Sequence, residues 1–243
     1  MRTDLAILLG ILAVAIATMP IYAASAAGRR DPLDLAQRGS FVLGGFVRSW
    51  FYWFAGPVER VALALRMSPT AFNVLGVAFG VASGVAFAMG RLGLGGWAVL
   101  LGGVADVLDG RIARAQGVEG PRGAFLDSTL DRFAEVGAFV GLAVYFQAST
   151  PALAMVTAGL GGSLLVSYAR ARGESVGIVC KVGVMQRAER LLLIGFGGIL
   201  DPIVAAGTPW SEGALLLALL TLVAVGTIGT AVYRTIWIAQ RLG

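Results

Sequence analysis

The sequence predicts an all-α membrane protein whose helices form a polytopic bundle. Of its 243 residues, 57% are hydrophobic and only 14% are charged, whereas about a quarter of a soluble domain is charged. Apolar runs of about 20 residues, enough for a helix to cross roughly 30 Å of hydrocarbon, recur along the chain. The 35 glycines suit helices that pack closely in lipid.

Seven apolar runs are candidate membrane spans. The first, residues 5–24, could also be a signal peptide, because small residues follow it. The run is long for a signal peptide and only Arg2 precedes it, so we expect a retained, extra N-terminal helix. The other runs form a predicted six-helix core at 70–89, 97–116, 123–147, 151–171, 187–206 and 213–238.

The segment 31–67 mixes aromatic residues with arginines and predicts an amphipathic helix in the membrane interface. Its marker residues are Arg48, Trp50, Phe51, Tyr52, Trp53, Phe54, Arg60 and Arg66. We expect Pro57 to break or kink this helix, and Ser68 and Pro69 to start the next one. The chain therefore divides into an N-terminal apolar helix (1–30), an interfacial segment (31–67) and a six-helix membrane domain (68–243).

The basic residues predict the orientation of the spans. If 28–67 is cytoplasmic and the spans alternate, only Arg2 and Arg91 of the 19 basic residues lie outside. Such a bias is typical of the inside-positive rule. We expect a multi-pass protein of the cell (cytoplasmic) membrane with its site facing the cytoplasm.

Composition also limits the chemistry. The chain has no histidine and one cysteine, Cys180, which argues against zinc, a Ser-His-Asp triad and an intramolecular disulfide. The formal charge of +5 favours anionic lipid or phosphate as a partner. Nucleic acid is not expected, because no soluble stretch is long enough for a binding domain.

Four aspartates in the stretch 106–131 are the candidate site. Asp106 and Asp109 are three apart, and Asp127 and Asp131 are four apart, so each pair shares a helical face. A turn made by Gly117, Gly120 and Pro121 would bring the pairs together in an antiparallel hairpin. Carboxylates that converge in an apolar setting need cations between them, which favours two hard divalent ions.

The residues between the aspartate pairs suggest a phosphate ligand. Gly110 and Gly123 allow close approach of a substrate or backbone, and Arg114 offers a planar fork for phosphate. The alternative is that the aspartates cap helices or form ordinary ion pairs with the neighbouring arginines, Arg111, Arg114, Arg122 and Arg132.

The spacing Asp106-x2-Asp109-Gly110-x2-Ala113-Arg114-x8-Gly123-x3-Asp127-x3-Asp131 resembles the signature of the CDP-alcohol phosphotransferase family, with every position filled. The resemblance extends over about 60–240, since that family is a six-helix membrane enzyme preceded by a short interfacial helix. The first run, 5–24, lies outside the family's usual core.

The resemblance implies a transferase that joins a phosphatidyl-type group from a CDP-linked lipid to an alcohol and releases CMP. The four aspartates would hold two magnesium or manganese ions, and Asp131 would also act as general base on the acceptor hydroxyl. Gly110, Ala113, Arg114 and Gly123 would line the CDP site. The family also suggests a homodimer.

A second basic cluster follows at 167–190 and contains Arg170, Arg172, Lys181, Arg187 and Arg190. Arg187 and Arg190 can share a helical face, and Arg170 and Arg172 could act together if the helix ends near Gly173. Ordinary inside-positive flanking is the alternative for any one of them. As a group they predict an anion site for a phosphorylated acceptor.

This cluster is similar to the acceptor region of phosphatidylinositol-phosphate and archaetidylinositol-phosphate synthases. The similarity implies that Arg170, Arg172, Arg187 and Arg190 bind the acceptor's phosphate. We therefore expect transfer from CDP-diacylglycerol to a phosphorylated polyol, with inositol 1-phosphate ahead of glycerol 3-phosphate. A cation transporter with pore-lining aspartates and a catalytically inactive scaffold are the competing hypotheses.

Overall fold

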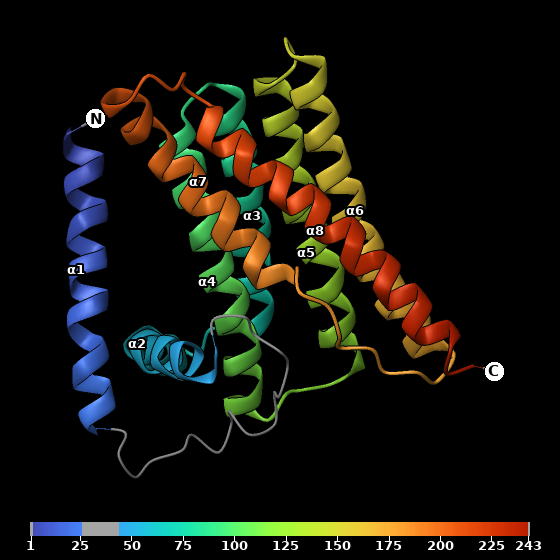
Figure 1. The fold of residues 1–243 in the computed structure, drawn as a ribbon. Helices are drawn as coiled ribbons and strands as arrows, with labels where there is room; N and C mark the ends of the chain where they lie inside the picture. The colour runs from blue at the N-terminus through green and yellow to red at the C-terminus, as the bar shows by residue number, and fades with distance from the viewer. Residues whose placement is uncertain (1, 26–43, 243) are drawn as a thin grey trace. The chain divides into compact units, whose positions relative to one another are not determined.

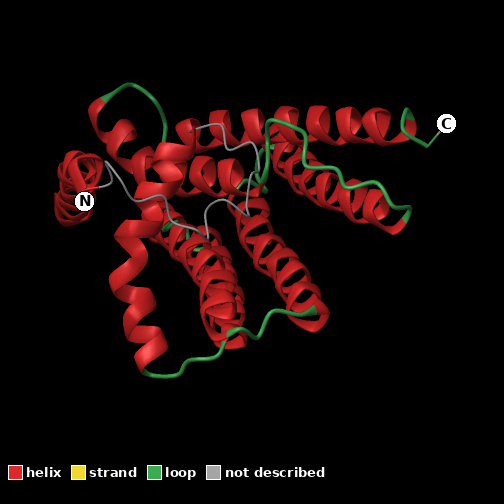
Figure 2. Cartoon of the chain, turned by 90° about the horizontal axis from the view of Figure 1, so that it is seen from below, coloured by secondary structure: helices red, strands yellow, loops and turns green. Residues whose placement is uncertain are grey.

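The computed structural model describes residues 2–25 and 44–242, and within those ranges it contains eight α-helices and no strand (Figures 1 and 2). This confirms the predicted all-α membrane bundle. Each of the seven predicted spans matches one helix, and no span runs more than two residues past its helix. The helices are α1 (Arg2–Ser25), α2 (Gly44–Ala64), α3 (Pro69–Ala88), α4 (Leu92–Gln116), α5 (Pro121–Tyr145), α6 (Thr150–Ser175), α7 (Arg187–Gly207) and α8 (Ala214–Ala239). The chain divides into two compact units between Met67 and Ser68.

The first unit contains α1 and α2. The Trp50 indole N–H donates to Thr18 Oγ1 at 3.1 Å, and the rings of Tyr22 and Trp53 lie 5.8 Å apart. α2 continues through Pro57, so the expected break there is wrong. Proline removes one backbone hydrogen bond, but the bonds on either side keep the helix continuous.

The six helices of the second unit pack as a closed ring. α3 packs against α4 and α5, α4 against α7, α7 against α8, α8 against α6, and α6 against α5. In Figure 1, α7 (orange) lies over α4 (green) and α8 (red) runs alongside α6 (yellow). α4 and α5 contact α3 far more than each other, so the hairpin that carries the aspartates is held apart by a third helix.

Two features of sequence fix the position of α3. The Ser68 hydroxyl accepts the Ala71 N–H at 3.2 Å, with Pro69 at the first helical position, which confirms the predicted helix start. Further along, Gly84 of α3 faces Gly141 of α5 so closely that a Cβ on Gly141 would overlap the Gly84 backbone. Small residues are what permit such close helix contacts in lipid.

The apolar core occupies one half of the ring, near the turns that end α3, α5 and α7. Its buried members are Phe87, Leu92, Val99, Ala138, Phe139, Leu142, Val156, Ile194, Leu216, Leu220 and Val223. At this end Asp201 is 1% exposed and accepts the N–H groups of Gly213 and Leu216 at 2.6 and 2.9 Å, which caps α8. The polar groups in the other half of the ring are therefore the candidates for a functional site.

Five of the described helices are long and apolar enough to cross a membrane, namely α3, α4, α6, α7 and α8. The protein is therefore a multi-pass membrane protein. α5 is as long as α4 but carries the charged residues Arg122, Asp127, Asp131, Arg132 and Glu135. These charges all precede the part of α5 that contributes Ala138, Phe139 and Leu142 to the apolar core.

Candidate active site

The turn between α4 and α5 forms as its residues predict. Gly117 ends α4 with φ of +65°, and its N–H bonds to the carbonyls of Ala113 and Arg114. Gly120 is extended, and Pro121 takes the first position of α5. A left-handed glycine closing one helix and a proline opening the next make this a short, defined connection.

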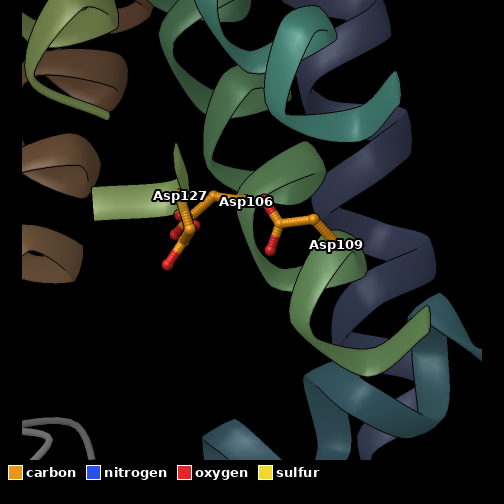
Figure 3. A group of neighbouring side chains, drawn as sticks. All are labelled: Asp106, Asp109 and Asp127. Carbon is orange, nitrogen blue, oxygen red and sulfur yellow. The ribbon is translucent and has the colours of Figure 1, made fainter. Parts of the chain in front are cut away.

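Three of the four aspartates converge beside this turn. Asp106, Asp109 and Asp127 each offer a carboxylate oxygen, and these oxygens all lie within 4.8 Å of one another. Figure 3 shows the side chains of Asp106 and Asp109 on α4 and that of Asp127 on α5, directed toward a common space. Asp109 is only 5% exposed, so its charge is largely removed from water.

The three carboxylates fit a divalent cation. Asp109 Oδ2 and Asp127 Oδ1 are buried and have no hydrogen-bond partner in the described part of the chain. Buried carboxylate oxygens are costly unless something satisfies them. An all-oxygen, anionic donor set is what hard ions such as Mg²⁺ and Mn²⁺ prefer. Asp106, Asp109 and Asp127 are therefore the residues that would hold such ions.

The fourth aspartate joins this group through an arginine. Arg187, at the start of α7, places Nη1 2.5 Å from Asp106 Oδ2 and Nη2 2.8 Å from Asp131 Oδ1. Arg132 lies 3.8 Å from Asp131 Oδ2. Asp131 thus lies one helical turn beyond Asp127 on α5, where α5 contacts Arg187 of α7. The sequence predicted that Arg187 would bind the acceptor's phosphate.

The candidate CDP residues lie around the same turn. Arg114 Nη1 is 4.0 Å from Glu119 Oε1, and its Nε is buried without a partner among the described residues. A Cβ on Gly110 would lie 3.4 Å from Arg114 Nη1, whereas one on Gly123 would meet nothing within 4 Å. A Cβ on Gly110 would thus make only ordinary contact with the guanidinium. The half-buried Ala113 lies on the turn of α4 between Gly110 and Arg114.

The basic cluster divides into an exposed and a buried pair. Arg170 Nε bonds to Glu174 Oε1 at 2.9 Å, and Arg172 Nη1 bonds to Ser175 Oγ at 3.2 Å, both on the surface. α6 ends at Ser175, two residues beyond Gly173. Gly173 also serves packing, because a Cβ there would lie 2.8 Å from Ile238 Cδ1.

Arg190, the other member of the buried pair, points into the ring. It is 1% exposed, and its Nε lies 2.8 Å from Glu135 Oε1. The Ser163 hydroxyl also donates to Glu135 Oε1. Sequence reasoning missed both Glu135 and Ser163. The available signal was spacing: Asp127, Asp131 and Glu135 recur every four residues and so share one face of α5.

A cluster of carboxylates that suits divalent cations, beside arginines that suit phosphate, defines a class of protein. It is a membrane-embedded, metal-dependent enzyme that acts on phosphorylated substrates. The family model for CDP-alcohol phosphatidyltransferase matches residues 66–238. The chain therefore belongs to the CDP-alcohol phosphatidyltransferase family, as the signature predicted, and is a divalent-cation-dependent transferase.

Curated relatives and solved structures agree with this family. The chain is 36% identical over 188 residues to the phosphatidylinositol phosphate synthase of Cutibacterium acnes, covering 74% of this chain and 89% of that one. It is 33% identical to the archaetidylinositol phosphate synthase of Methanothermobacter thermautotrophicus, covering 76% and 90%.

Among solved structures, the chain resembles the Mycobacterium tuberculosis phosphatidylinositol phosphate synthase with CDP-DAG bound. The TM-score is 0.66 at 29% identity, over 75% of this chain and 92% of that one. The same enzyme in complex with manganese and citrate gives a TM-score of 0.64 at 30% identity, over 74% and 88%.

Proposed function

We propose that this protein transfers the phosphatidyl group of CDP-diacylglycerol to a phosphorylated polyol, with inositol 1-phosphate as the acceptor. The observation that carries the proposal is the convergence of Asp106, Asp109 and Asp127 beside Arg187. That arrangement supplies a place for a metal-bound diphosphate and a cation for a second anionic substrate. The relatives named above are synthases of phosphatidylinositol phosphate and archaetidylinositol phosphate, which supports inositol phosphate.

The transfer is a substitution at phosphorus. The acceptor hydroxyl attacks the phosphorus of the phosphatidyl group, its proton passes to the Asp131 carboxylate, and the bond from that phosphorus to the CMP oxygen breaks. Divalent cations bound by the aspartates would neutralise charge on the diphosphate and on the departing CMP. Arg114, Gly110, Ala113 and Gly123 would line the CDP moiety, as the signature implies.

The acceptor phosphate would be held by Arg170, Arg172, Arg187 and Arg190. Of these, Arg187 has the strongest support, because its Nε is buried with no hydrogen-bond partner within the described ranges. Arg170 and Arg172 are exposed on α6 and bonded to nearby residues of the same helix, so an incoming phosphate could recruit them. Arg190 would contribute positive charge from behind Arg187.

We further propose that the site faces the cytoplasm and that the enzyme is a homodimer. The orientation rests on the inside-positive bias, which leaves only Arg2 and Arg91 on the outer side. The dimer rests on family resemblance. The interfacial role of 31–67 and the retention of 5–24 as a separate N-terminal helix also remain proposals.

The test compares acceptors directly. Purified protein is incubated with CDP-diacylglycerol, Mg²⁺ or Mn²⁺, and either inositol 1-phosphate or glycerol 3-phosphate, while CMP release and the lipid product are measured. We expect phosphatidylinositol phosphate as the main product. Faster turnover of glycerol 3-phosphate would favour a phosphatidylglycerophosphate synthase, and no CMP with any phosphorylated polyol would overturn the proposal.

The general base is tested separately. Asp131→Asn should abolish CMP release while the variant elutes and melts as the parent does. An active variant would remove Asp131 from that role. The family membership disfavours a cation transporter, which would instead predict metal flux into liposomes containing the protein.

A further inference from the structure

Two ion pairs join α5 to α7 one above the other. On α5 the acids are Asp131 and Glu135, four residues apart; on α7 the bases are Arg187 and Arg190, three apart. Arg187 reaches Asp131 at 2.8 Å, and Arg190 reaches Glu135 at 2.8 Å. The first pair belongs to the site, whereas the second lies one helical turn further into the bundle.

The Glu135 pair is enclosed and fully bonded. Glu135, Arg190 and Ser163 are 5%, 1% and 0% exposed. Glu135 Oε1 accepts from Ser163 and from Arg190 Nε, and Oε2 accepts from Arg190 Nη2 at 3.4 Å. Arg190 Nη1 donates to the Met185 carbonyl at 3.3 Å, just before α7 begins. Three helices and the preceding loop therefore meet at one carboxylate.

Such a pair is poorly explained by stability alone. Taking two charges out of water costs about as much as their attraction returns, so apolar residues of similar volume often serve stability equally well. Buried polar networks instead specify one arrangement among several. In this protein, the network around Glu135 would fix the position of the first turn of α7, which carries Arg187.

Arg187 is not packed tightly on every side. A cavity of about 30 Å³ adjoins it, lined by Arg187 and Glu135 together with Ser83, Gly102, Ala134 and Leu191 among others. A side chain next to free volume keeps a single position only if specific bonds hold it. The Arg187–Asp131 and Arg190–Glu135 ion pairs supply such bonds between α5 and α7.

We propose that Glu135, supported by Ser163, is a positioning residue of the active site. It holds Arg190, and thereby the start of α7, so that Arg187 meets Asp106 and Asp131 in the geometry needed for metal binding and for the acceptor. The kinetic part of this inference rests on the proposed function; the metal-binding part does not. Glu135 itself touches neither the three-carboxylate group nor a substrate group in this assignment.

The test uses Glu135→Gln, which keeps the shape and removes the charge. With its partner neutral, the Arg190 guanidinium has Asp131 as the next carboxylate along α5, where it competes with a metal ion. Loss of a direct partner of a metal ligand typically weakens affinity by about 10- to 100-fold. Because Glu135 reaches the ligands only through Arg190 and Arg187, we expect the lower end of that range, about tenfold weaker Mn²⁺ binding by the intact purified protein. Glu135→Asp keeps the charge and should recover part of that affinity.

Asp201→Asn is the matched control. Asp201 is equally buried, 1% exposed, and accepts two backbone N–H groups, but it lies at the end of the bundle away from the site. Both variants should lower Tm, whereas only Glu135→Gln should weaken Mn²⁺ binding and raise KM for the acceptor. If Glu135→Gln binds Mn²⁺ like the parent and merely melts lower, as Asp201→Asn does, the positioning role is wrong.

Two further outcomes are decisive. If Glu135→Gln does not fold, Ser163→Ala replaces it, because it removes only one of the bonds to Glu135. About two- to threefold weaker Mn²⁺ binding, well below the usual effect of losing a direct ligand partner, supports the proposal, and unchanged binding overturns it. If the parent turns over no phosphorylated polyol, the proposed function fails, while the Mn²⁺ titration still decides the role of Glu135.

Discussion

The Arg187 guanidinium lies 2.8 Å from the Asp131 carboxylate, and the same guanidinium reaches Asp106. These residues belong to α7, α5 and α4, so one side chain ties together three helices of the ring at the site. The proposed base is therefore oriented by the arginine proposed to receive the acceptor's phosphate. Under the proposed function, this arrangement would couple metal binding, acceptor binding and proton transfer in one place.

Replacing Arg187 should damage catalysis more than stability. Arg187→Gln removes both ion pairs, and because the loss of one preorganised donor at a reacting centre costs about 100- to 1,000-fold in rate, we expect a decrease of that order in kcat/KM for the acceptor. Arg187→Lys should be intermediate, since an ammonium cannot bridge two carboxylates as a planar fork does. The control is Arg91→Gln, an exposed residue at the far turn; equal losses in both would contradict the assignment.

Removing one carboxylate should expose the metal dependence. Asp127→Asn leaves the helix intact but deletes a charge from the three-carboxylate group. Losing an outer partner costs about 10- to 100-fold in metal affinity, so losing a ligand should cost at least as much. Mn²⁺ titration followed by electron paramagnetic resonance measures this directly. EDTA should stop CMP release by the parent, and added Mg²⁺ or Mn²⁺ should restore it; activity that survives chelation would argue against the metal site.

Gly123 offers a test for substrate contact, because a substitution there should not disturb packing within the protein. A Cβ there meets no protein atom within 4 Å, so Gly123→Ala should change stability by no more than about 1 kcal/mol, the usual helix preference for alanine. If CDP-diacylglycerol lies against this position, the added methyl should raise its KM several-fold. Gly161→Ala on α6 also enters open space and should change neither quantity. Identical kinetics in the two variants would remove Gly123 from the CDP site.

The contact between α3 and α5 should tolerate no side chain. A Cβ on Gly141 would overlap the backbone of Gly84, so Gly141→Val must separate two helices of the ring. Overpacking a core typically costs about 1–3 kcal/mol, and we expect the upper end or loss of folding, because backbone rather than a side chain must move. Thermal melting in detergent, with Gly161→Val as the control, measures the difference. Similar melting of both variants would show that the helices can separate at little cost.

Much of the fold and part of the site follow from local sequence. Run length and composition are sufficient to predict the spans. Ser68 and Pro69 are sufficient to predict the start of α3. Gly117, Gly120 and Pro121 are sufficient for the turn, because their backbone preferences act within a few residues. The same locality explains why Asp106, Asp109 and Asp127 could be placed together: they flank one short connection.

Only the tertiary structure decided which helices surround the site and what each arginine meets. α3 separates α4 from α5, which no spacing along the chain reveals. Arg187 and Arg190 look like two equivalent surface cations in sequence, yet one joins Asp106 and Asp131 while the other is enclosed with Glu135. Charges find partners across space, and the order of helices around the ring is set by how whole helix faces pack. The sequence by itself therefore determined the membrane bundle, its signature and the class of chemistry, and the packing of α5 against α7 decided the geometry that chemistry would use.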